Sequence, residues 1–135
     1  MDIDIACTLD QLVVARHFVT GQLEAYRMAE KEKAMLTSAV DELCANIIIH
    51  GNNQDPAKKL NLSVKKVGNH LCINTCDKGI AFDKTMVVRR TMGQLVEAKV
   101  KGGLGLMIIH KATDSFEYQR KGDRNYFYMI KSLEL

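Results

Sequence analysis

Hydrophobic and polar positions change their spacing several times along the 135-residue chain. The opening MDIDIAC alternates with period two, which predicts a short first strand. In the next segment, TLDQLVVARHFVTGQLEAYRMA, the apolar positions recur at helical spacing after a cap signal at Thr8 or Asp10. A second helix is predicted from Glu32 to Ile49, ending near Gly51, where turn-forming residues cluster.

The second half of the chain predicts two hairpins. KKLNLSVKKV and HLCINTCD alternate and are joined by Gly-Asn, while SFEYQRK and NYFYMIKSL flank Gly-Asp. Between the hairpins lie a poorly periodic segment, residues 84–101, and a short predicted helix in KGGLGLMIIHKA. This order predicts an α+β fold, a two-layer sandwich with helices on one face of a mixed, mostly antiparallel sheet. We expect residues 1–135 to form a single domain.

Composition and charge exclude several classes of protein. A hydrophobic content of 47% supports a core and argues against general disorder. A net charge of +3 without a long basic run predicts no direct binding to nucleic acid. The chain has no apolar run of membrane-spanning length and its acidic start is no signal peptide, so we expect a cytoplasmic protein without a membrane partner. Four cysteines without CxxC spacing indicate neither a disulfide framework nor a zinc site.

The second predicted helix carries an unusual polar stripe in the stretch DELCANIIIHG. Glu42, Asn46 and His50 share one face, because a step of four residues turns the helix by about 400°. Leu43 and Ile47 point in other directions and can pack in the core. Either the polar face is simply solvated or it lines a cleft. A cleft would explain Asn46, a poor residue for a helix interior, because its amide oxygen suits a hydrated Mg²⁺ ion.

A second polar feature, CDKGIAFD, directly follows a predicted strand. Asp77 at the strand end can accept a hydrogen bond from an exocyclic amine. Gly79 has no Cβ and would let a flat ring approach the backbone. The alternative is an ordinary Asp-x-Gly turn.

The glycine-rich stretch KGGLGLMII opens the short predicted helix. Backbone N–H groups of Gly102, Gly103 and Gly105, followed by a helix N-terminus, favour an anion and could form a phosphate cradle to which Lys101 adds charge. The spacing matches neither a Walker A motif nor a dinucleotide-binding fingerprint. The alternative is a flexible loop joined to a helix.

Together, an E-x3-N-x3-H helix, a strand ending in D-x-G and a G-x-G-L helix start resemble the ATP-binding motifs of the gyrase, chaperone, histidine kinase and MutL superfamily, the Bergerat fold. Within it, DELCANIIIHG, DKGIAFD, GGLGLMII and GDRNYFYMI are most similar to the anti-sigma factor serine/threonine kinases. The resemblance implies an ATP- and Mg²⁺-dependent kinase that binds a sigma factor and phosphorylates an anti-sigma factor antagonist protein on serine. Whether it forms a homodimer stays open.

The resemblance also implies roles for single residues. Glu42 matches the general base and Asn46 the Mg²⁺ ligand. Asp77 matches the carboxylate that binds adenine, and Gly79 the glycine beneath the base. His50 also stands at a common family position, where we expect it to support the site rather than touch the reacting groups.

Further roles are implied for the phosphate loop, the lid and the partner surface. The implied ATP-binding residues of the loop are Lys101, Gly103, Leu104 and Gly105. Residues 84–101 correspond to the lid over the phosphates. Arg16 resembles an arginine that contacts partner proteins.

Two other functions remain open from the sequence. One is a non-catalytic, ATP-dependent protein-binding module that binds nucleotide and partner without turnover. The other is a histidine-kinase-type catalytic domain. The second is disfavoured because the chain shows no preceding dimerisation helices with an acceptor histidine, and a lone helical histidine such as His17 is a weak candidate.

Overall fold

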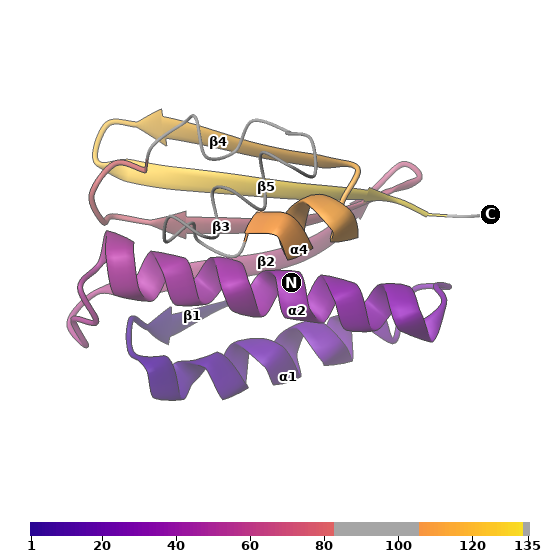
Figure 1. Ribbon diagram of the computed structural model, residues 1–135, viewed down its shortest axis with the longest axis horizontal. Coiled ribbons are helices and arrows are strands. Elements are labelled where there is room, and N and C mark those ends of the chain that lie inside the picture. Colours follow the sequence, from indigo (N-terminus) through magenta and orange to yellow (C-terminus); the bar gives the residue numbers. More distant parts are fainter. Residues whose placement is uncertain (83–105, 134–135) are drawn as a thin grey trace.

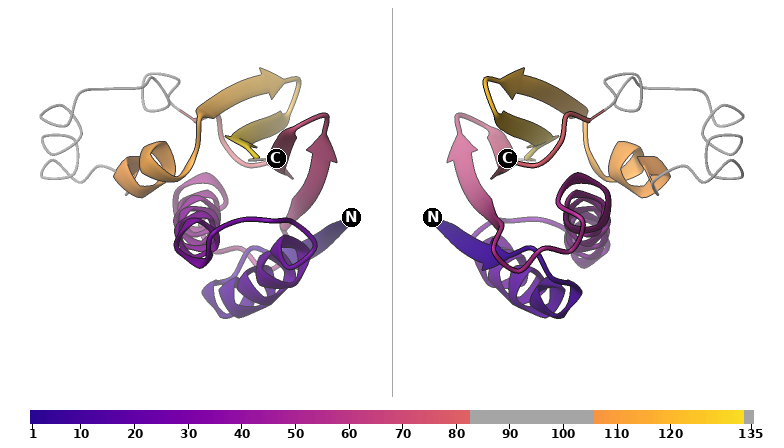
Figure 2. Two further views of the ribbon diagram at one scale, coloured as in Figure 1. Left: turned by 90° about the vertical axis from the view of Figure 1, so that its right-hand side faces the viewer. Right: turned by 90° about the vertical axis from the view of Figure 1, so that its left-hand side faces the viewer.

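The computed structural model describes residues 1–82 and 106–133. These residues form two layers, a five-stranded sheet with helices on one face (Figures 1 and 2). The strands are β1 (Asp2–Ala6), β2 (Lys59–Val67), β3 (His70–Asp77), β4 (Ser115–Lys121) and β5 (Arg124–Ser132). Their order is β1-β2-β3-β5-β4 and each neighbouring pair is antiparallel. The predicted α+β sandwich is confirmed, with an antiparallel sheet throughout these strands.

The alternating segments form the strands because one face of the sheet is covered and the other is not. In β2, Leu60, Leu62 and Val64 are buried, whereas the intervening side chains face outward. Both predicted hairpins are confirmed, joining β2 to β3 and β4 to β5. Their turns contain Gly68 and Gly122, whose φ angles are 59° and 60° and therefore favour glycine.

The helical segments are a 3₁₀ turn (Leu9–Gln11), α1 (Leu12–Leu23), α2 (Glu30–Asn46), a π-helical turn (Ile47–Gly51) and α4 (Leu106–Ala112). Helix α2 lies over the sheet, between α1 and α4, and runs roughly along the strands (Figure 1). The end-on views place α1, α2 and α4 on the same side of the sheet (Figure 2). Among the described residues, no helix has both the length and the apolar character needed to cross a membrane.

Three details of the predicted helix ends were wrong. The first helical segment starts as a 3₁₀ turn, and the Thr8 hydroxyl bonds the Asp10 carboxylate instead of capping the helix backbone. The second helix starts at Glu30, two residues before the predicted Glu32, because carboxylates in a first turn interact favourably with the helix dipole. It also ends differently, since its last residues widen into a π-helical turn.

The core lies between α2 and the inner face of the sheet. The largest fully buried side chains are Ile5, Leu23, Leu36, Leu43, Ile48, Leu60, Leu62, Leu71, Ile73, Ile109, Phe127 and Met129. Full burial of one such side chain contributes about 1.5–3 kcal/mol. This packing fixes which face of α2 points away from the sheet.

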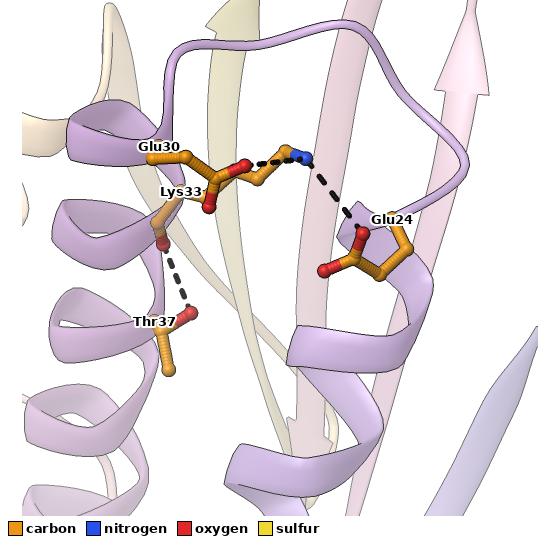
Figure 3. Close-up of polar contacts among 4 residues, drawn as sticks. All are labelled: Glu24, Glu30, Lys33 and Thr37. Carbon is orange, nitrogen blue, oxygen red and sulfur yellow. Dashed lines mark hydrogen bonds and ion pairs between the residues drawn. The ribbon is translucent and has the colours of Figure 1, made fainter.

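Lys33 connects the end of α1 to the start of α2 (Figure 3). Its Nζ lies 3.5 Å from Glu30 Oε1 and 4.0 Å from Glu24 Oε2. The Thr37 hydroxyl donates to the Lys33 carbonyl at 2.9 Å. Because both glutamates are exposed, each ion pair contributes at most about 1 kcal/mol. Lys33 thus bridges the two helices with little effect on stability.

Candidate functional site

Asp77 is a buried carboxylate at the end of β3, on the inner face of the sheet, with 3% of its surface exposed. One oxygen, Oδ2, accepts hydrogen bonds from Gly79 N at 2.8 Å, Asn52 Nδ2 at 3.1 Å and Asn125 Nδ2 at 3.3 Å. The other oxygen, Oδ1, is buried and has no hydrogen-bond partner among the described residues. A buried acceptor without a partner is costly. Asp77 therefore fits a ligand that donates a hydrogen bond.

Asn125 holds the loop that follows Asp77. Its side-chain amide donates to the carbonyls of Ile80 at 2.9 Å and Gly79 at 3.3 Å, as well as to Asp77. Its own Oδ1 accepts from Tyr118 Oη at 2.6 Å and from Arg120 Nη1 at 3.0 Å. These bonds satisfy the buried Asn125 amide. They also anchor the loop that follows Asp77 to strands β4 and β5.

Arg120 and Tyr118 add further bonds along the same loop. Arg120 Nη1 donates to the Gly79 carbonyl at 2.7 Å. The backbone N–H of Phe82 donates to the Tyr118 hydroxyl at 2.9 Å, and the Phe82 ring contacts Phe127 with centroids 5.1 Å apart. The loop after β3 is thus held along its length by polar bonds and closed by an aromatic contact.

The glycine at position 79 is required by the end of the π-helical turn. A Cβ at Gly79 would lie 2.2 Å from the carbonyl oxygen of Gly51 and 2.7 Å from its carbon. The same Gly51 carbonyl accepts a hydrogen bond from Ile80 N at 2.9 Å. The close approach therefore joins the Asp77 loop to the end of the second helix, a reason for glycine that the D-x-G pattern did not reveal.

The polar stripe on the second helix is only partly regular. Glu42 is exposed and Asn46 is half-buried, whereas Leu43 is buried beneath them. Glu42 and Asn46 lie one turn apart, about 6 Å along the axis. His50 is exposed but belongs to the π-helical turn, where hydrogen bonds span five residues instead of four, so the straight continuation of the stripe is lost.

The π-helical turn ends against Asn52, a residue that the sequence did not single out. Asn52 is 4% exposed, and its Nδ2 donates to the carbonyl of Ile47 at 3.0 Å as well as to Asp77. Single π turns inside helices are frequent at functional sites. Here the turn brings the C-terminal end of the helix to the buried carboxylate.

Glu42 and the predicted partner residue Arg16 line the same open hollow of about 310 Å³. The hollow lies between α1, α2 and α4 and is lined by Arg16, Thr37, Ser38, Asp41, Glu42 and Ile108. A second hollow of about 390 Å³ borders Asp77, but most of its lining side chains belong to the outer face of the sheet. Because the partners of the Asp77 carboxylate lie on the inner side, the inner side is the candidate site.

Part of the predicted site lies outside the described residues. This applies to Lys101, Gly102, Gly103, Leu104 and Gly105 of the proposed phosphate loop, and to the proposed lid at residues 84–101. Helix α4 begins at Leu106, directly after the loop. Within the described part of the chain, no three His, Cys, Asp or Glu residues gather in a metal-binding group. A single amide oxygen such as that of Asn46 suits Mg²⁺ that keeps water and phosphate as its other ligands, the usual mode in phosphoryl-transfer sites.

Two functional candidates were missed from the sequence, Asn52 and Asn125. A signal existed for Asn125, which occupies an inward position of β5 where Phe127 and Met129 follow in the same alternation. A polar residue at such a position needs internal hydrogen bonds. Asn52 had no such signal, because it stands in a run of turn formers.

A family model of the histidine kinase-like ATPase domain matches residues 5–131. The chain belongs to this family. The membership predicted from three separate motifs is therefore confirmed, and it implies ATP binding.

Two solved structures share the fold of this histidine kinase-like ATPase domain. The SiaB–SiaC complex from Pseudomonas aeruginosa matches with a TM-score of 0.68 and 14% identity, over 98% of this chain and 89% of that chain. The RsbU and RsbW domains of Rv1364c from Mycobacterium tuberculosis match with a TM-score of 0.64 and 12% identity, over 98% of this chain and 32% of that chain. The chain thus spans about a third of the latter. At these identities the likeness concerns the fold alone, and no curated protein sequence matches the chain.

Proposed function

We propose that the chain is an anti-sigma regulatory factor that binds Mg²⁺–ATP, phosphorylates an antagonist protein on serine and sequesters a sigma factor. The observation that carries this proposal is the buried Asp77 Oδ1, which lacks a donor among the described residues. Membership in the histidine kinase-like ATPase family supports adenine as the source of that donor. The resemblance of the motifs to anti-sigma factor kinases supports the choice of partners.

Asp77 would recognise the exocyclic amine of adenine. Its Oδ2 is already held by three donors, which fix the plane of the carboxylate and leave Oδ1 for the base. Because Oδ1 is shielded from solvent, the base must displace the side chains that cover it. Asn52 and Asn125 then act by holding the carboxylate in place.

The phosphates would extend from the base along the second helix. Gly51, which contacts the Asp77 loop, lies about 13 Å along the helix from Glu42, with Asn46 between them. Asn46 is the proposed protein ligand for Mg²⁺, which supplies charge neutralisation and alignment of the γ-phosphoryl group. The proposed phosphate loop, Lys101 with Gly103, Leu104 and Gly105, would hold the same phosphates through backbone N–H groups and one ammonium group.

Glu42 would act as the general base. Its exposed carboxylate in the hollow can take the proton from an incoming serine hydroxyl. The serine oxygen then forms a bond to the γ-phosphorus, the bond from that phosphorus to the β–γ bridging oxygen breaks, and ADP leaves. Water in place of serine would give slow hydrolysis at the same site.

The partner surface would include the exposed side of α1. Arg16 is half exposed, and Leu9 and Val13 are 42% and 44% exposed on the neighbouring turns. Arginine is enriched among the residues that contribute most to binding at protein interfaces. This arrangement supports docking of the antagonist protein next to Glu42.

The test is transfer of labelled phosphate from ATP to candidate antagonist proteins. We expect Glu42→Gln to bind Mg²⁺–ATP normally and to transfer phosphate about 10²–10⁴ times more slowly, because the amide keeps the shape but not the basicity. Asn46→Ala should lose both nucleotide affinity and rate. Glu117→Gln, an exposed change on β4, is the matched control and should leave both unchanged.

Two results would count against this function. A wild-type rate in Glu42→Gln would remove Glu42 from the reaction. A wild-type protein that binds ATP and partner proteins but never transfers phosphate would favour the non-catalytic binding module.

A further inference from the structure

An ion pair between two helices fixes one side of the hollow that contains Glu42. Arg16 Nε on α1 donates to Asp41 Oδ1 on α2 at 2.8 Å. Both side chains line the hollow, and Asp41 directly precedes Glu42. The pair is partly exposed, at 48% for Arg16 and 35% for Asp41, so its contribution to stability is small. Its position beside the proposed base suggests another role.

The bond engages only part of the arginine. A guanidinium group has five N–H donors in one rigid plane. Only Nε of Arg16 has an acceptor among the described residues, which leaves the edge formed by Nη1 and Nη2 available. Because Asp41 holds Nε, it restricts the orientation of that plane before a partner arrives. An ordered side chain loses less entropy on binding than a mobile one.

We propose that Asp41 is a positioning residue, which holds Arg16 so that its Nη1 and Nη2 groups meet main-chain carbonyls of the protein substrate. This inference rests on the proposed kinase function and adds a docking element to it. The bound segment would lie in the hollow and present its serine to Glu42, with Ile108 as the apolar wall.

The charges in the hollow favour an uncharged hydrogen-bond acceptor on the protein substrate over a carboxylate. Among the described residues that line the hollow, Asp41 balances the Arg16 charge and Glu42 adds a further negative charge. An incoming carboxylate would meet this net negative charge, whereas a peptide carbonyl would not. Binding through carbonyls should therefore depend little on salt between about 50 and 300 mM, concentrations at which a charge-driven contact weakens strongly.

The first test needs no partner. In nitrogen-15 NMR of the wild-type protein, the Arg16 Nε–H proton should exchange slowly with water. Asp41→Ala should make this exchange fast, whereas Asp41→Asn should keep it partly slow, because the amide oxygen can still accept the bond. Fast exchange in the wild type would overturn the positioning role. Circular dichroism checks that the variants fold, which is expected because alanine is a strong helix former.

The second test uses the antagonist protein that accepts phosphate in the assay above. Asp41→Ala should raise KM for that protein about two- to tenfold, the cost of ordering one long side chain on binding, and leave kcat unchanged. Asp41→Asn should restore most of the affinity. Arg16→Ala combined with Asp41→Ala should be no worse than Arg16→Ala alone. Glu117→Ala, which removes an exposed carboxylate on β4 outside the hollow, is the control and should leave KM and kcat unchanged.

The outcomes separate this inference from the proposed function. Tighter partner binding by Asp41→Ala would mean that Asp41 masks Arg16 and would overturn the inference, as would an unchanged KM or a steep salt dependence. If no protein accepts phosphate, the same variants are measured by calorimetry against the proteins that form a complex. An Asp41 effect on complex formation would then uphold the inference while the kinase function fails. If no candidate protein binds at all, the docking role is overturned.

Discussion

At the scale of single residues, Gly79 and Asp77 are the most constrained positions of the candidate site. Gly79 brings the loop after β3 against the Gly51 carbonyl at a distance that no side chain could tolerate. Asp77 combines one fully bonded oxygen with one that lacks a partner among the described residues. The sequence predicted both residues as site candidates because a D-x-G after a strand is a recognisable pattern. It did not predict that Asn52 and Asn125 hold this carboxylate, because they bond Asp77 across 25 and 48 residues of sequence.

Replacing Gly79 with alanine should destabilise the protein. The added methyl group would overlap the Gly51 carbonyl, and such overpacking costs about 1–3 kcal/mol of the free energy of unfolding. Urea denaturation measures the change. Gly21→Ala is an informative control, because its change in the free energy of unfolding should have the opposite sign. Position 21 lies inside α1 with nothing within 4 Å of an added methyl group, so alanine should stabilise it by about 0.5–1 kcal/mol. A Gly79→Ala protein as stable as the wild type would contradict the close approach.

At the scale of elements, the second helix combines a regular part with a π-helical turn. The regular part carries Glu42 and Asn46 on one side, as the four-residue spacing predicted. The π-helical turn could not be predicted, because buried Ile47 and Ile48 suit an α-helix and a π turn equally well. The Asn52 side chain holds the turn by a local bond to the Ile47 carbonyl and by a tertiary bond to Asp77, 25 residues away.

Asn52→Ala should therefore weaken both the fold and nucleotide binding. The substitution removes the donor to Ile47 and Asp77 in a buried setting, so we expect a loss of about 1–3 kcal/mol in the free energy of unfolding. Nucleotide affinity should fall as well, because the Asp77 carboxylate loses one of three restraints. Asn61→Ala, which removes exposed bonds to Asp2 and Asp4, should change stability by less than about 0.5 kcal/mol. Equal effects of the two substitutions would show that the turn does not depend on Asn52.

At the scale of the whole molecule, the sheet order places the site between elements from both halves of the chain. The pairing of β3 with β5 brings Asn125 beside Asp77. The sequence predicted the two hairpins, because each is local and is marked by a glycine turn. It did not predict which strands of the two hairpins would pair, because that choice depends on how the helices cover one face and on long-range packing.

The buried cysteines of this core predict how stability depends on pH. Burial raises the pKa of the Cys44 thiol from 9.0 to about 12, and burial together with the Asp77 carboxylate raises the pKa of Cys7 to about 11. In the unfolded chain both thiols ionise near their ordinary pKa of 9.0, so unfolding above that pH releases protons. The contribution of the two protonated thiols to the free energy of unfolding is fully present below pH 9. It should fall as the pH rises from 9 to about 12. Urea denaturation across this range measures it, and a Cys7→Ala and Cys44→Ala double variant should show a flatter decline. An equal decline in that variant would contradict this account.

The most direct test of the nucleotide site is calorimetric titration with ATP and with inosine triphosphate, in which a carbonyl replaces the exocyclic amine. The wild-type protein should bind ATP more tightly by about 1–3 kcal/mol, because inosine places a carbonyl oxygen, an acceptor, where adenine offers its amine to Asp77 Oδ1. Asp77→Asn should lose this preference, because its amide can turn an N–H₂ group toward the base, and Asp4→Asn on the outer face should keep it. Equal affinities of the wild-type protein for the two nucleotides, or an unchanged preference in Asp77→Asn, would contradict the proposed site.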